Sequence, residues 1–103
     1  MHLVRNAQDQ IVEVEVVGDN TELTISEVSQ LLAGEAASVE LCNARLAEYP
    51  QMIAELEAKK LNYDNGDADA FQVEIDKWTA ELAAIPAQKA SAKARLMLYN
   101  KYV

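Results

Sequence analysis

The chain has 103 residues, of which seventeen are acidic and nine basic, so its net charge is −8. That length fits one domain, and the acidic balance argues against direct nucleic-acid binding, which needs clustered Lys and Arg. A single cysteine, Cys42, excludes an internal disulfide and any zinc site built from several cysteines. No apolar stretch has the roughly 18 residues of a membrane span, and the N-terminus lacks the apolar run of a signal peptide. The cytoplasm is therefore the expected compartment.

Residues 11–17 have the pattern of a half-buried β-strand, because three valines alternate with two glutamates. The valines, which share one face, are Val12, Val14 and Val16. Turn-forming residues flank the segment, so His2–Arg5 and Thr21–Leu23 are expected to pair with it, making residues 1–23 a two- or three-stranded ribbon. A ribbon this small is marginal alone. Its valine face is therefore expected to rest on the helices that follow or on another chain.

Residues 24–63 are predicted to form a long first helix. Thr24 and Glu27 fit a capping box, in which each side chain accepts a hydrogen bond from the other residue's backbone N–H. Apolar residues then recur in steps of three and four, the heptad spacing of a coiled coil. The twelve seam positions, ten of them apolar when the cysteine and both tyrosines are counted, are Ile25, Val28, Leu32, Glu35, Val39, Cys42, Leu46, Tyr49, Ile53, Leu56, Lys60 and Tyr63. Pro50 is expected to kink or briefly interrupt this helix.

Residues 68–100 repeat the spacing after a turn-forming segment, 64–67, and are predicted to form a second helix with a kink near Pro86. Its seam consists of Phe71, Ile75, Trp78, Leu82, Ile85, Lys89, Ala92, Leu96 and Tyr99. Two heptad helices joined by a short turn predict an antiparallel hairpin. If the chain reverses near residue 67, facing residues have numbers that sum to roughly 132–136, and Pro86 lies opposite residues 46–50.

The charge distribution supports this pairing of the two helices. Residues 1–82 hold five basic and all seventeen acidic residues, a net of −12, whereas four basic residues and no acid follow. Folding back places the basic tail beside acidic positions of the first helix, which are Glu27, Glu35, Glu40 and Glu48. The predicted fold is mainly α: one domain, residues 1–103, with an antiparallel coiled-coil hairpin and a small N-terminal β-ribbon.

The end of the chain is apolar all around the helix, although a two-helix hairpin can bury only one stripe. The ribbon is expected at this same end, so apolar surface remains for a partner or a second copy. The predicted interface comprises Val12, Val14, Val16, Leu96, Met97, Leu98, Tyr99 and Tyr102.

Nothing in the sequence predicts a catalytic, cofactor or metal site. The only imidazole is His2, next to the start, and Cys42 falls on the helical seam, where a free thiol acts as a small apolar residue. The acids Asp64, Asp67 and Asp69 lack the glycine at position six and glutamate at position twelve of an EF-hand loop. They are interpreted as a solvated loop with helix caps in preference to a weak cation site.

These features favour a non-enzymatic protein–protein interaction or assembly module, which self-associates or docks on a larger complex. An adaptor, an assembly chaperone and an accessory structural part of a virus or phage, inside the particle, all fit such a shape. Two-fold and three-fold assemblies are equally allowed. An alternative is an acidic decoy or inhibitor that binds the basic, nucleic-acid-binding surface of a target protein. A small-molecule enzyme using the loop acids is a third hypothesis.

Overall fold

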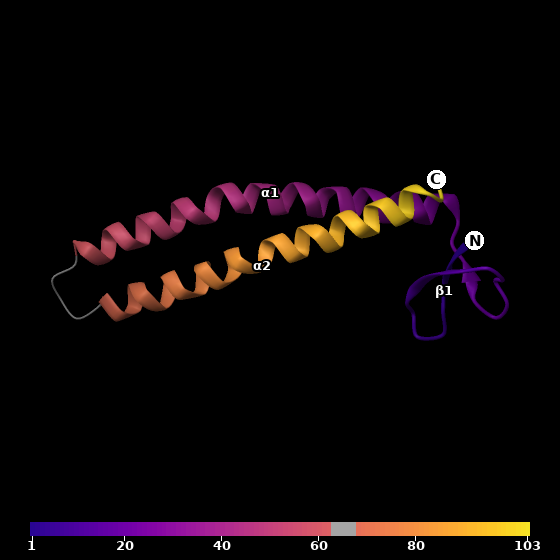
Figure 1. Ribbon diagram of the computed structural model, residues 1–103, viewed down its shortest axis with the longest axis horizontal. Helices are drawn as coiled ribbons and strands as arrows, with labels where there is room; N and C mark the ends of the chain where they lie inside the picture. Colours follow the sequence, from indigo (N-terminus) through magenta and orange to yellow (C-terminus); the bar gives the residue numbers. More distant parts are fainter. Residues whose placement is uncertain (63–67) are drawn as a thin grey trace.

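The computed structural model describes residues 1–62 and 68–103, and its two helices form a long antiparallel hairpin (Figure 1). The elements are β1 (His2–Arg5), β2 (Ile11–Val14), β3 (Thr21–Glu22), α1 (Ile25–Leu61) and α2 (Ala68–Asn100). Both termini and the sheet lie at one end of the hairpin, here called the base. The molecule measures 67 × 23 × 17 Å. The predicted fold, a helical hairpin with a small N-terminal sheet, is confirmed.

The start of α1 is the predicted capping box. The Thr24 hydroxyl accepts from the Glu27 backbone N–H at 3.1 Å, and the Glu27 carboxylate accepts from the Thr24 N–H at 3.1 Å. The hydrogen bonds from Thr24 lower the pKa of Glu27 below its ordinary value. At its other end, α1 finishes at Leu61 with Asn62 as C-cap. The predicted seam position Tyr63 and the predicted turn 64–67 lie outside the described residues.

The two heptad seams meet as the core of the hairpin. Within the described residues, every seam position is buried or half-buried except Ile25, which is 72% exposed. Tyr49 and Trp78 pack edge to face across the helices, with ring centroids 4.9 Å apart. These aromatic residues are therefore core residues of the hairpin, as their heptad spacing indicates.

The register of the hairpin is close to the expected one. Lys60 Nζ donates to Gln72 Oε1, and the numbers of these two residues sum to 132, as predicted. The Trp78 ring contacts Tyr49, although Trp78 was expected opposite residues 54–58. Long aromatic side chains reach along the helix, so this contact does not require a different backbone register. One expected charge pair forms as well, because Arg95 Nε donates to Glu35 Oε1 at 2.7 Å.

Both prolines lie inside continuous helices, so the brief interruption considered at Pro50 does not occur; the kinks predicted near both prolines stay predictions. Pro50 is within α1 and Pro86 within α2, and both are exposed. Each proline lacks the N–H that would bond the carbonyl four residues earlier. The apolar seam continues on either side, so tertiary packing sustains the helix across the missing bond. Pro86 shares a surface groove with Leu46, in agreement with its expected position opposite residues 46–50.

The sheet has the order β2-β1-β3, so the central strand is β1. The predicted pairing of His2–Arg5 with the 11–17 segment is confirmed, because β1 pairs antiparallel with β2. The predicted pairing of residues 21–23 with that segment is wrong, because β3 pairs with β1. β2 ends at Val14 and lies at an edge, because the chain then turns. In that turn, both the backbone N–H and the side-chain amide of Asn20 donate to the Val17 carbonyl at 3.0 Å, and Gly18 has a positive φ of 55°.

Thr24→Ala is expected to lower the free energy of unfolding by about 1 kcal/mol, because it removes the N-cap acceptor. Urea denaturation followed by circular dichroism measures this. Ser29→Ala, at an exposed position inside α1, is the control and should cause no loss. Equal losses in both variants would show that the cap makes no specific contribution.

Candidate functional site

The two faces of the sheet have different surroundings. In the pairing of β1 with β2, Leu3 is opposite Glu13 and Val4 is opposite Val12. Paired residues project from the same face, and successive residues alternate. Leu3 belongs to the core with Val28 and Tyr99, and Ile11 packs against that core. The face that carries Leu3, Ile11 and Glu13 is therefore the one that rests on the helices.

The opposite face carries the valines and points away from the helices. Val4 is fully buried there, Val12 and Val14 are half-buried, and Val16, beyond the end of β2, is 76% exposed. His2 projects from this face as well and shares a hydrogen bond of 2.9 Å with Glu22. The valine face was expected to rest either on the helices or on another chain. It does not rest on the helices.

The predicted C-terminal interface divides between core and surface. Tyr99 is 5% exposed and belongs to the core, while Leu98 and Tyr102 pack against that core from outside. Leu96 is half-buried beside a groove, and Met97 is 72% exposed. Of the C-terminal segment, Met97 is thus the predicted interface residue that is most open to a partner.

The C-terminus is fastened to the sheet by one polar contact. The Tyr102 hydroxyl donates to Glu13 Oε2 at 2.5 Å, across 89 positions of sequence. This hydrogen bond to the carboxylate raises the pKa of Tyr102 above its ordinary value, because ionising the phenol would remove the donor. The bond joins the end of the chain to the helix-facing side of the sheet. It therefore helps to keep the sheet packed on the ends of the helices.

Among the described residues, the surface grooves between the helices include the following three. Leu46, Pro86, Lys89, Ala90 and Lys93 line a middle groove of about 330 Å³. A groove of about 310 Å³ at the far end is lined by Glu57, Lys60, Leu61, Gln72 and Ile75. Near the base, Leu32, Ala36, Leu96, Met97 and Asn100 line one of about 280 Å³.

All three grooves open on the same side of the hairpin, here called the grooved side. Their lining residues recur at multiples of seven along each helix, and residues so spaced share a face of a supercoiled helix. On α1 these are Leu32, Leu46 and Lys60; on α2 they are Pro86, Lys93 and Asn100. The heptad spacing did not predict these grooves, but the size of two residues next to the seam could have. Ala36 and Pro86 have short side chains, which leave the neighbouring seam residues partly uncovered.

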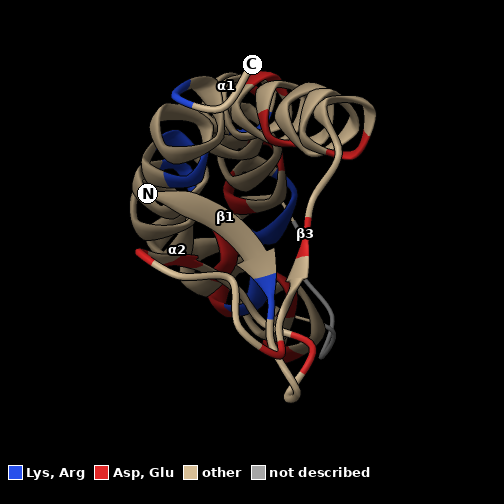
Figure 2. Cartoon of the chain, turned by 90° about the vertical axis from the view of Figure 1, so that its right-hand side faces the viewer, with Lys and Arg blue, Asp and Glu red and all other residues tan. Residues whose placement is uncertain are grey.

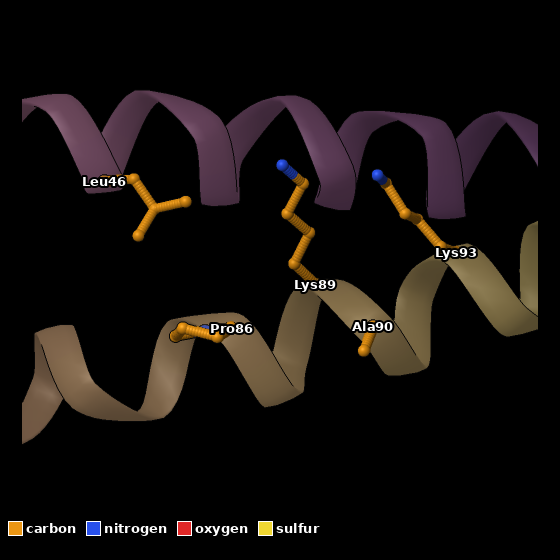
Figure 3. A pocket seen from close by; sticks show the side chains of 5 residues that line it. All are labelled: Leu46, Pro86, Lys89, Ala90 and Lys93. Carbon is orange, nitrogen blue, oxygen red and sulfur yellow. The ribbon is translucent and has the colours of Figure 1, made fainter.

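Figure 3 shows the middle groove from close by. Leu46 points from α1 toward α2, and the amino groups of Lys89 and Lys93 point back toward α1. Neither lysine makes an ion pair within residues 1–62 and 68–103. The groove therefore combines an apolar floor with two positive charges.

No catalytic arrangement is found in the part of the chain that the structure describes. Cys42 is buried in the seam, and no group of three metal-ligating side chains occurs among the described residues. Of the loop acids, Asp69 lies in the first turn of α2, where its negative charge interacts favourably with the helix dipole and so stabilises the helix. Asp64 and Asp67 lie outside the described residues.

Comparisons of the chain with models of protein families, with curated proteins and with solved structures gave no match. Among the described helices, none combines the length and the apolar character needed to cross a membrane.

Tyr102→Phe is expected to destabilise the fold at pH 8 but not at strongly alkaline pH. A raised pKa in the folded state means that the stabilisation is fully present below the unfolded pKa of about 10 and is lost as pH rises through the folded pKa. Urea unfolding of both proteins at pH 8 and at about pH 11 measures the difference. Tyr49→Phe is the control. A difference between Tyr102→Phe and the parent that stays constant with pH would exclude this role of the hydroxyl.

Proposed function

We propose that this chain is a non-enzymatic assembly module that self-associates or docks on a larger protein complex. The observation that carries the proposal is the large uncovered surface of a small chain. Its solvent-accessible area is 7067 Å², whereas a compact monomer of 11.4 kDa exposes about 5,800 Å². Its radius of gyration is 20.5 Å, against about 13 Å for a compact chain of this length.

The uncovered surface includes large apolar side chains. Val16 at the sheet and Met97 on α2 are 76% and 72% exposed, and both belong to the predicted interface. Exposed apolar groups at the end of an elongated molecule support docking, because association removes them from water. An adaptor, an assembly chaperone and an accessory part of a viral particle remain the roles that fit this architecture.

The acidic-decoy alternative draws on charge alone. Acidic residues mark the loops of the sheet and the helix surfaces in Figure 2, where Lys and Arg are interspersed along the helices. Arg95 already neutralises Glu35, so part of the basic tail is used within the chain. A decoy needs a continuous field of one sign, and this distribution favours an assembly module over it.

Met97→Asp is expected to weaken assembly, because the side chain is 72% exposed and carries no buried contact that stability depends on. Light scattering over a range of concentrations measures assembly, and urea denaturation measures stability. Ala87→Asp, at an exposed position of α2 that lines none of the three grooves, is the control and should assemble normally with the same stability as Met97→Asp. A parent chain that is monomeric at high micromolar concentration and captures no partner contradicts the proposal.

Raising the salt to about 0.5 M, where the Debye length is under about 5 Å, should leave the association nearly unchanged. Burial of apolar surface does not depend on long-range charge, whereas a decoy would lose its basic target steeply. Binding measured by titration calorimetry at low and high salt separates these hypotheses. A drop in affinity of a hundredfold or more would favour the decoy.

A further inference from the structure

We infer that a second copy of this chain packs antiparallel on the grooved side, so that Asp76 of each copy faces Lys93 of the other. The inference rests on the self-association in the proposed function and specifies its surface and direction. It concerns the side of the hairpin, not the valine face at the base. Four observations carry it: the open grooves, the complementary residues about the middle of α2, the charges without an ion pair and the uncovered area.

The grooves leave seam residues accessible that a third layer would cover. Leu32 and Leu46, both half-buried, each line one of them. In a bundle of four helices each helix buries a wider stripe than in a hairpin, including the positions next to the seam. Ala90 and Pro86 border the middle groove with short side chains, which permit close approach of another helix.

Along the grooved side, the residues of α2 are complementary in size and charge about the point between residues 84 and 85. The residues there follow the heptad columns that line the grooves, and all but Gln72 are exposed: Gln72, Asp76, Thr79, Ala83, Pro86, Ala90, Lys93 and Met97. When two copies of α2 cross that point antiparallel, Ala83 meets Pro86 and Thr79 meets Ala90. The centre of the contact then consists of small side chains. On either side of this centre, Asp76 of one copy meets Lys93 of the other.

The charges on α2 match this direction. Lys93 makes no ion pair, and Asp76 accepts one hydrogen bond, from Gln72 Nε2 at 2.7 Å, within the described ranges. Of the charged residues of α2, four of the first five are acidic, whereas the last three, Lys89, Lys93 and Arg95, are all basic. Antiparallel pairing lays the acidic half on the basic half of the partner. Such complementarity fixes direction more than it adds affinity.

The area is sufficient for a stable pair. The chain exposes 7067 Å², roughly 1,300 Å² more than a compact monomer of its mass. A standard interface buries about 800 Å² on each partner. The surplus exposed area is therefore large enough for a second copy to form an interface of standard size along the grooved side.

Charge reversal tests the arrangement. Asp76→Lys and Lys93→Asp should each weaken self-association by at least about tenfold, because each places two like-charged contacts in the pair. The double variant D76K/K93D should restore the dissociation constant to within about threefold of the parent. Residues 76 and 93 lie about 25 Å apart along one helix, so rescue cannot arise within a single chain. Sedimentation equilibrium measures all four proteins.

Glu81→Lys is the matched control, with the same charge change on the same helix but away from the grooved side, and it should associate like the parent. Self-association that tolerates both single reversals, or is not restored in the double variant, overturns this arrangement and leaves the proposed function standing. A parent chain that is monomeric at high micromolar concentration also overturns it. The proposed function then depends on a different protein partner.

Discussion

Packing of α1 on α2 along a single seam is the interaction on which the rest of the structure depends. A two-helix rod has one interior interface, so each helix can remove only one stripe from water. The described residues accordingly contain eight buried apolar side chains. Among these residues, a third layer is found at the base, where Leu3 of the sheet joins Val28 and Tyr99. Burial of a large apolar side chain contributes about 1.5–3 kcal/mol. Four of the eight buried side chains are at the base and four follow the seam, so the free energy of folding is divided between the two regions.

The Glu35–Arg95 pair contributes more to the choice of register between the two helices than to the free energy of their packing. Glu35 occupies a seam position, its side chain is 18% exposed, and its Oε2 atom is buried without a hydrogen-bond donor. Desolvation of that carboxylate offsets much of the gain from the 2.7 Å contact with Arg95. A slip by one heptad, however, would place the guanidinium beside Cys42 or Val28. A charged pair at this apolar seam therefore disfavours the neighbouring registers.

The sequence predicted the helices well and the sheet poorly, for a physical reason. Nine seam positions over 68–100 and the capping box at Thr24 are repeated or paired signals, and the elements formed where these indicated. The four residues of β1 carry no such repetition, so nothing identified it as the central strand. The face of a sheet that meets the helices is set by strand pairing, and alternation in β2 alone cannot show it. The grooves likewise depend on which register the two helices adopt.

The valine face and the grooved side arise from different features and occupy different places, so one does not obstruct the other. The sheet lies at the base, while the grooves follow the side of the rod. An antiparallel pair along the grooved side would carry its two sheets at opposite ends. Each end would then offer its own valine face, including the exposed Val16. Two identical docking ends on one rigid rod increase avidity only for partners whose sites match its length. Such a rod would therefore select regularly spaced sites, as found in a symmetrical assembly, over single ones.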